Sequence, residues 1–289
     1  MSLSEQAFQS VLKRLDRIAD ALEAGAGRDE DATDFDAAVA WRWLNTNGRG
    51  RLRPIQRRHA ISLNDLHNID RPKRLLTANT RQFLDGKPAN NALLWGARGT
   101  GKSSLVKALL NEYAEQGLRL VEIEKTRLAD LPEIIDLLWD RPERFILFCD
   151  DLAFQESEPG YQALKATLDG SVSATPENLL IYATSNRRHL LPEKMADNHD
   201  AEWIDGELHQ SDAVEEKVSL SERFGLWLSF LPFKQDEYLK AVQHWLAVYG
   251  LSDALDEETS KEAVRWALLR GSRSGRVAHQ FARDYAGRS

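Results

Sequence analysis

Apolar residues follow two alternating patterns from residue 91 onward. Short apolar runs of strand length are separated by segments in which apolar residues recur at helical spacing. The runs predict buried strands at 91–96, 118–125, 145–152, 178–186 and 226–233. The intervening segments predict helices at 102–116, 128–139 and 161–168. Strands that alternate with helices are joined by crossovers, so we expect an α/β fold with a five-stranded parallel sheet covered on both faces.

The strand pattern stops after Pro232. Three amphipathic segments follow, at 236–249, 256–270 and 275–286, and they predict a small all-helical domain. We therefore place an α/β domain at 46–234 and a helical domain at 235–289.

Residues 1–45 have a different character. An apolar stripe from Phe8 to Leu22 recurs every three or four residues, which fits a short coiled-coil seam or a docking helix equally well. A polar linker follows, and the apolar, aromatic stretch 37–44 is expected to dock on another part of the chain.

The stretch 47–59 is loop-like in composition and rich in arginine. Its arginines are Arg49, Arg51, Arg53, Arg57 and Arg58. A basic arm that contacts nucleic-acid phosphates is one interpretation. A solvated or acid-paired loop is the other, and we favour it because no aromatic side chains are interleaved for base stacking.

Composition narrows the class of protein. The chain has 289 residues, 42% of them hydrophobic and 29% charged, and a net charge of −7, which argues against wholesale nonspecific nucleic-acid binding. Cys149 is the single cysteine, so an intramolecular disulfide is excluded. The first residues lack the apolar core of a signal peptide, and no run reaches a membrane span of about 18 residues. We expect a reduced cytoplasmic protein with no membrane partner.

The strongest motif is a glycine-rich phosphate cradle between a predicted strand and a predicted helix. It matches G-x-x-x-x-G-K-[ST] with Gly96, Ala97, Arg98, Gly99, Thr100, Gly101, Lys102 and Ser103 and continues into Ser104. Glycines allow the backbone amides to surround phosphate oxygens, and the helix that opens at Lys102 directs its positive end at the same anion. Lys102 is expected to reach the β- and γ-phosphates of ATP, and the Ser103 hydroxyl to ligate Mg²⁺.

Two adjacent aspartates end the apolar run at 145–149. Ligands bind at the carboxyl ends of strands in open α/β sheets, so Asp150 is placed to hold the water shell of Mg²⁺. Asp151 occupies the place of a water-activating carboxylate, with Glu156 as a less favoured substitute. Cys149 is interpreted as a small buried apolar residue. Asn186, in a polar cluster after the next strand, would orient the attacking water, bond the γ-phosphate or cap the following turn.

These motifs, in order, resemble those of AAA+ ATPases. The residues are GARGTGKS, FILFCDD, IYATSN, SERFG and SGRVA, and the resemblance covers roughly residues 60–286. NALLWGARGTGKSS, CDDLAF, LKATLDGS and IYATSNRRHLLPE look like an uncharacterised bacterial family of predicted AAA+ ATPases with a domain of unknown function. The resemblance implies a P-loop NTPase of AAA+ type whose helical domain is a lid over the nucleotide.

The resemblance also implies residue roles. Lys102 and Ser103 fall in Walker A, Asp150 and Asp151 in Walker B, and Asn186 at sensor 1. Arg223 falls at the arginine finger, although a surface ion pair is its plain alternative. Arg276 matches sensor 2, with Arg273 near enough in sequence to compete for that role.

A finger supplied in trans implies a head-to-tail homo-oligomer, because the catalytic site would span two subunits. The acidic insert 196–217 is more simply a solvated loop than a partner contact. Its His199 and His209 have no ligand-like neighbours in sequence, so we expect no metal site there.

Two functions are consistent with this set of residues. The first is an ATPase that uses ATP and Mg²⁺ to remodel or move a protein or nucleic-acid client. The second is a nucleotide-dependent assembly switch with negligible turnover. We favour the ATPase, because Lys102, Asp150, Asn186, Arg223 and Arg276 are all retained. A small-molecule kinase is disfavoured by the lack of a visible acceptor motif.

Overall fold

The fold is described from a computed structural model. It describes residues 14, 17, 33–46, 48–154, 158–170, 176–188, 190, 202–204, 207–209, 220–251 and 255–288. The chain divides into two units, 1–37 and 38–289. The predicted helix at 4–23, Glu156, His199 and nearly all of the insert 196–217 lie outside the described residues. Of that insert only the backbone of two short strands is described, β7 (Glu202–Ile204) and β8 (Glu207–His209), which pair antiparallel.

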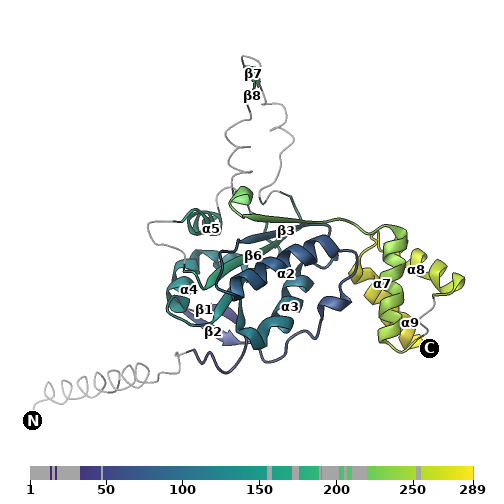
Figure 1. The fold of residues 1–289 in the computed structure, drawn as a ribbon, viewed down its shortest axis with the longest axis horizontal. Coiled ribbons are helices and arrows are strands. Elements are labelled where there is room, and N and C mark those ends of the chain that lie inside the picture. Colours follow the sequence, from purple (N-terminus) through teal and green to yellow (C-terminus); the bar gives the residue numbers. More distant parts are fainter. Residues whose placement is uncertain are drawn as a thin grey trace, which may run out of the picture. The chain divides into compact units, whose positions relative to one another are not determined.

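A seven-stranded sheet forms the centre of the second unit (Figure 1). Its order is β2-β1-β4-β5-β6-β3-β9. The five predicted strands are β3 (Ala92–Gly96), β4 (Leu118–Ile123), β5 (Arg144–Cys149), β6 (Leu179–Ser185) and β9 (Leu226–Phe230). All five are parallel, which confirms the predicted α/β sheet.

A hairpin extends this sheet beyond β4. β1 (Ala40–Thr46) runs parallel to β4, and β2 (Arg49–Pro54) pairs antiparallel with β1 as the edge strand. The prediction that residues 47–59 form a loop is therefore wrong for 49–54. Leu52 is buried while the arginines on either side of it are exposed, a period of two that is typical of a half-buried strand. The three-domain division stays a prediction, although residues 40–45 belong to this sheet.

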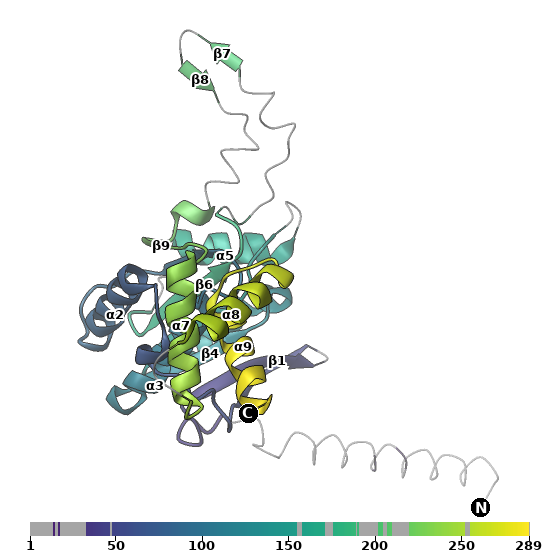
Figure 2. The same ribbon diagram turned by 90° about the vertical axis from the view of Figure 1, so that its right-hand side faces the viewer.

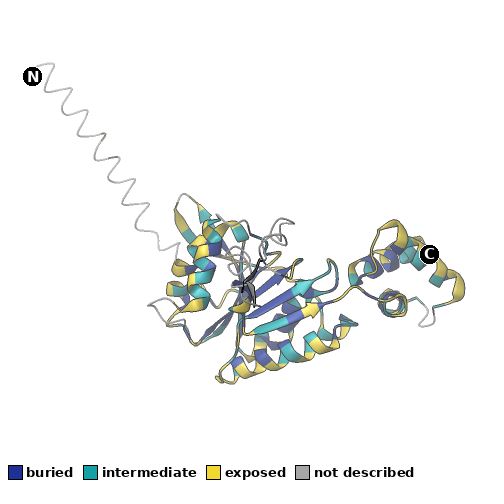
Figure 3. Cartoon of the chain, turned by 90° about the horizontal axis from the view of Figure 1, so that it is seen from above, coloured by how far each residue is buried: buried dark blue, intermediate teal, exposed yellow. Residues whose placement is uncertain are grey.

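Helices cover both faces of the sheet. Helices α2 (Asp70–Leu84) and α3 (Lys102–Tyr113) lie on one face (Figure 1) and share a buried core with alternate residues of the strands. The other alternate strand residues face α4 (Leu131–Leu138) and α5 (Pro159–Asp169). Figure 3 shows the central strands as largely buried. Short 3-10 turns at Leu63–Asp65, Ala114–Gln116 and Lys125–Asp130 connect these elements.

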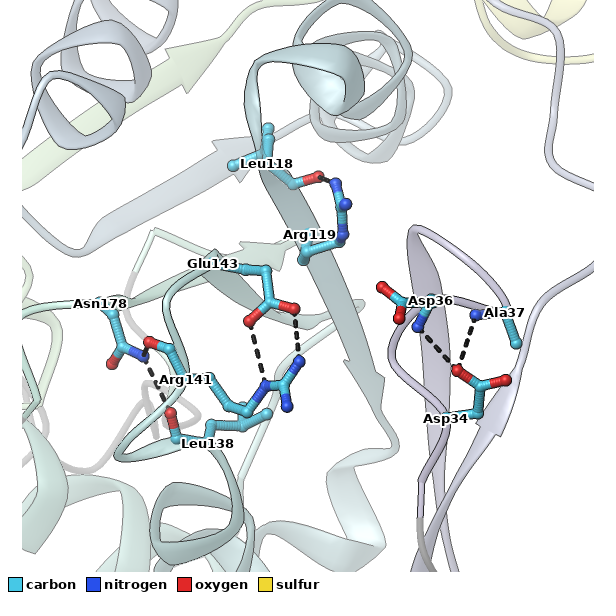
Figure 4. A network of polar contacts seen from close by, with 9 residues as sticks. All are labelled: Asp34, Asp36, Ala37, Leu118, Arg119, Leu138, Arg141, Glu143 and Asn178. Atoms are coloured by element: carbon cyan, nitrogen blue, oxygen red, sulfur yellow. Dashed lines mark hydrogen bonds and ion pairs between the residues drawn. The ribbon is translucent and has the colours of Figure 1, made fainter.

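Polar side chains form hydrogen bonds at the ends of the strands near α4. The Asn178 amide donates to the carbonyls of Leu138 and Arg141, at 2.9 and 2.8 Å, and so ties the start of β6 to the segment after α4 (Figure 4). Arg141 in turn forms a two-bond ion pair with Glu143. Burial is the largest single effect and raises the pKa of the Glu143 carboxyl. Hydrogen bonds from Arg141 and the backbone, together with the charges of Arg141 and Arg119, outweigh it and leave that pKa below its usual range.

Three helices follow the sheet, as predicted, and group together (Figure 2). They are α7 (Gln235–Val248), α8 (Glu257–Leu269) and α9 (Gly275–Arg288). Their apolar faces form a core of their own around Tyr238, Ala263 and Phe281. Within the part of the chain that the structure describes, no helix is both long enough and apolar enough to cross a membrane.

Candidate nucleotide-binding site

The phosphate cradle connects β3 to α3 with the backbone that the motif requires. Gly96, Gly99 and Gly101 have φ of 134°, 76° and 104°, all in the region that favours glycine. A Cβ on Gly96 would lie 2.0 Å from the carbonyl oxygen of Phe230 in β9, so a side chain there would separate the two strands. In the sheet, β3 lies between β6 and β9, so the order of the strands changes direction beside it. Ligands bind at such a switch point.

Lys102 lies inside this turn. Its ammonium donates to the carbonyls of Gly96 and Ala97, at 2.9 and 2.8 Å, and to the Asn186 side-chain oxygen at 3.1 Å. Burial lowers the pKa of Lys102, and the carboxylates of Asp150 and Asp151 oppose that effect. Lys102 thus lies beside both aspartates, at the turn where the motif places the phosphates of a nucleotide.

Asp150, at the end of β5, accepts hydrogen bonds from two hydroxyl groups. Its Oδ1 accepts hydrogen bonds from Ser103 Oγ and Thr184 Oγ1, each at 2.5 Å. Thr184 also accepts from the backbone N–H of Asp151, at 2.9 Å, so this threonine couples β6 to both aspartates. In the sequence, Thr184 stands out only as one member of the polar cluster that ends at Asn186. Thr184 could nevertheless have been predicted as a site residue, because the parallel strands β5 and β6 end at the same edge of the sheet.

Asp151 and Asn186 contact each other directly. The Asn186 amide donates to Asp151 Oδ1, while the Asn186 oxygen accepts from Lys102. Asn186 therefore connects the cationic and anionic parts of the site. Asp151 is exposed, and its backbone is left-handed with φ of 56°.

The oxygen atoms of Ser103 and Asp150 fit a Mg²⁺ ion. Mg²⁺ binds oxygen ligands, keeps several waters and takes only one or two protein ligands beside nucleotide phosphates. A hydroxyl and a carboxylate oxygen 2.5 Å apart at the mouth of a phosphate cradle supply that donor set. Cys149, just before Asp150, is buried, and burial raises the pKa of its thiol, so it offers no thiolate ligand.

Helix α9 contacts the phosphate cradle. The backbone N–H of Arg276 donates to the Gly99 carbonyl at 3.1 Å, and a Cβ on Gly99 would lie 2.7 Å from the Ser274 hydroxyl. Arg276 lines the cavity and lies near enough to Lys102 to lower its pKa. Arg273 does not line the cavity and meets Phe233 through its backbone carbonyl. The geometry thus favours Arg276 over Arg273 for the sensor 2 role.

These groups open into a cavity of about 790 Å³, a size typical of ligand sites. Arg98 to Ser104, Asp150, Asp151, Thr184 and Asn186 line its phosphate end. The rest of its lining was not predicted from the sequence and includes several apolar side chains. This part of the lining includes Ile61, Leu66, Ile69, Phe233, Trp245 and His279. These residues come from four segments far apart in the chain, so no local motif connects them.

Arg223 does not line the cavity. It lies just before β9, and its side chain forms an ion pair with Asp169 at the end of α5. Within one chain, therefore, the candidate finger does not reach the phosphate cradle.

Residues 36–289 match the model of the family described as "Protein of unknown function (DUF815)", and the chain belongs to that family. A search of curated proteins finds no match.

Solved structures show a common fold at low identity. A RuvB variant from Thermotoga maritima has a TM-score of 0.52 and 17% identity over 77% of this chain and 63% of that one. The ORC1 protein of Aeropyrum pernix in complex with DNA has a TM-score of 0.54 and 14% identity over 77% of this chain and 60% of that one. This chain thus covers less than two thirds of either relative. The AAA+ fold implied by the motifs is confirmed.

Proposed function

We propose that this DUF815 protein binds ATP with Mg²⁺ and hydrolyses it at the interface between subunits, in order to remodel or move a macromolecular client. Lys102 and the amides of the cradle would hold the β- and γ-phosphates, and Ser103 and Asp150 would hold Mg²⁺. Asp151 would accept the proton of the attacking water, which Asn186 helps to position.

One observation carries this proposal. Lys102, Asn186 and Asp151 form a continuous chain of hydrogen bonds, and Asp150 with Ser103 lies beside it. Cation, metal ligands and candidate base thus converge on one end of a single cavity. A protein that only bound nucleotide would need the cation and the metal ligands, but it would not need a carboxylate positioned by Asn186.

The place of Arg223 supports an oligomer. Its guanidinium is held by Asp169 and lies outside the cavity, so it would have to act on the nucleotide of a neighbouring subunit. Such a finger is worth about 10³–10⁵ in kcat in GTPase systems. Assembly and hydrolysis would then be coupled.

Phosphate release by purified variants tests hydrolysis. We expect Lys102→Ala and Asp151→Asn each to lose roughly 100-fold or more in kcat, as for removal of a group that stabilises the transition state. Lys87→Ala is the matched control, because Lys87 is exposed and pairs with Asp85 away from the cavity. Equal, slow release by wild type and Lys102→Ala, at concentrations where oligomers exist, would instead establish the assembly switch.

Mixing two inactive variants tests the shared site. Lys102→Ala retains a functional Arg223, and Arg223→Ala retains a functional nucleotide site. Neither should turn over ATP alone, but their mixture should recover activity, because one subunit then supplies the finger and the other the nucleotide site. A mixture as inactive as its components would contradict a finger in trans.

A further inference from the structure

The hairpin β1–β2 gathers arginines on one face at the edge of the sheet. Its register pairs Arg42 with Arg53, Leu44 with Arg51 and Thr46 with Arg49, and paired residues of antiparallel strands point to the same side. Arg49, Arg51 and Arg53 therefore form a row whose members are about 7 Å apart. All three are exposed. Arg57 and Arg58 follow in the exposed segment after β2.

The opposite face of the hairpin is firmly anchored. Trp43 is buried, and its indole donates to Asp130 at 2.8 Å, where the Asn45 amide also donates. The Trp43 ring lies directly over Gly50, since a Cβ there would be 2.1 Å from it. The arginine row is thus built on a rigid support, which lowers the entropy cost of binding a partner.

The charge of this row is not neutralised within the described part of the chain. Arg42 pairs with Glu122 at 2.7 Å, but no ion pair of Arg49, Arg51 or Arg53 with another described residue is found. Such a concentration of arginines without an ion pair among the described residues, in a chain of net charge −7, indicates a local site for an anion.

The same segment continues into the wall of the nucleotide cavity. Residues 55–61 run along α3, where the Asn111 amide donates to the carbonyls of His59 and Ile61 and its oxygen accepts from Arg58. His59, Ala60 and Ile61 then line the cavity. The arginine row and this part of the cavity wall thus belong to one continuous segment, 49–61.

We propose that this face, formed by Arg49, Arg51, Arg53, Arg57 and Arg58, binds the phosphate backbone of a nucleic acid without reading its sequence. A nucleic acid would then be the client of the proposed ATPase, so the role of this face rests on the function proposed above. Arginines bind phosphates through charge and forked donors without needing apolar contacts.

An acidic protein is the less favoured partner. Protein interfaces are anchored by buried apolar and aromatic side chains. The large exposed apolar residues of the described chain all lie outside this hairpin, at Leu137, Trp139, Leu231, Val248, Tyr249, Leu268 and Leu269. The face therefore offers charge without apolar anchors, which suits a phosphate backbone.

The test is fluorescence anisotropy with a short labelled DNA duplex of mixed sequence. If five arginines contact phosphates, the affinity of the full chain should fall about 500-fold between 50 and 200 mM salt. The variant R49E/R51E/R53E should lose most of this binding and flatten the salt dependence. The control R71E/R74E/R81E reverses three exposed arginines of α2 and should bind like wild type.

Three results would overturn the proposal. They are no DNA binding by wild type at low salt, an equal loss in the α2 control, and polyglutamate binding as tightly as DNA, which would assign the face to an acidic protein. ATP binding and phosphate release by R49E/R51E/R53E are measured separately. A variant that turns over ATP in the absence of DNA but does not bind DNA upholds both proposals. A wild type that binds DNA without ATP turnover upholds only the inference about the face.

Discussion

At the scale of single residues, the backbone at Asp151 explains why an aspartate is suited to this position. Its φ of 56° lies in the left-handed region, which costs most residues about 1–2 kcal/mol, whereas Asn and Asp tolerate it through local hydrogen bonds. The Asp151 amide bonds to Thr184, and the side chain bonds to Asn186. A longer carboxylate would gain reach at the expense of this local fit.

We expect Asp151→Asn to unfold at the same denaturant concentration as wild type while losing hydrolysis. Asp151→Glu should lose about 1 kcal/mol of unfolding free energy, because Glu lacks the local hydrogen bonding that offsets a left-handed backbone. Urea unfolding measures both, with Asp136→Glu as control, since Asp136 is exposed in the regular helix α4. Equal stability of Asp151→Glu and wild type would contradict this explanation.

At the scale of elements, strands were predictable where they are buried and missed where they are not. The parallel strands β3, β5 and β6 read as nearly continuous apolar runs. The hairpin β1–β2 does not, because arginine occupies its exposed positions. The dipeptide Asn47-Gly48 between two alternating runs is nevertheless a strong two-residue hairpin signal, and it would have identified both strands.

Helix α2 was missed for a different reason. Two of its four buried residues, Asn79 and Thr80, are polar, so a search for apolar spacing does not find it. Both side chains hydrogen-bond the hydroxyl of Tyr182, at 3.0 Å each. That hydroxyl is supplied by β6, about a hundred residues later, and it removes the cost of burying these polar groups.

Packing of the hairpin predicts a specific cost for Gly50→Ala. The new methyl would lie 2.1 Å from the Trp43 ring and 2.6 Å from the Glu133 carboxylate, so the ring must move. We expect a loss of roughly 1–3 kcal/mol in unfolding free energy, as for overpacking. Gly287→Ala is the control, because no atom lies within 4 Å of that added methyl and the residue is helical. A neutral Gly50→Ala would show that the hairpin is loosely packed.

At the scale of the whole molecule, the site depends on contacts between segments that are distant in sequence. The glycine-rich motif and the strand-end aspartates were predictable because each is a local pattern with one chemical use. The rest of the cavity lining was not, since Leu66, Phe233, Trp245 and His279 line one cavity only when the C-terminal helices pack beside the sheet. The bond from the Asn68 amide to the Glu237 carbonyl, at 2.8 Å, is one of the contacts that hold these parts together.

Histidines at this junction should make the folded state sensitive to acid. The His67 and His244 rings are tilted to each other with centroids 4.3 Å apart, and the His279 ring centroid lies 4.4 Å from that of Trp245. Burial lowers the pKa of His67. The nearby His244 and Lys73 lower that pKa further, whereas Asp65 and Asp70 raise it. Burial and then Arg283 lower the pKa of His279. Both histidines therefore bind protons more weakly in the folded chain than in the unfolded chain.

The stability from these histidines is fully present above the unfolded pKa of about 6.5 and is lost as pH falls below it, because the unfolded state then takes up more protons. We expect the Tm to fall between pH 7.5 and 5.5, and His67→Gln to reduce that fall, since it removes one of the titrating groups. His59→Gln, at an exposed position, is the control. Thermal unfolding followed by circular dichroism measures each Tm. If His67→Gln and wild type lose the same number of degrees, the histidine at this junction does not set the acid sensitivity.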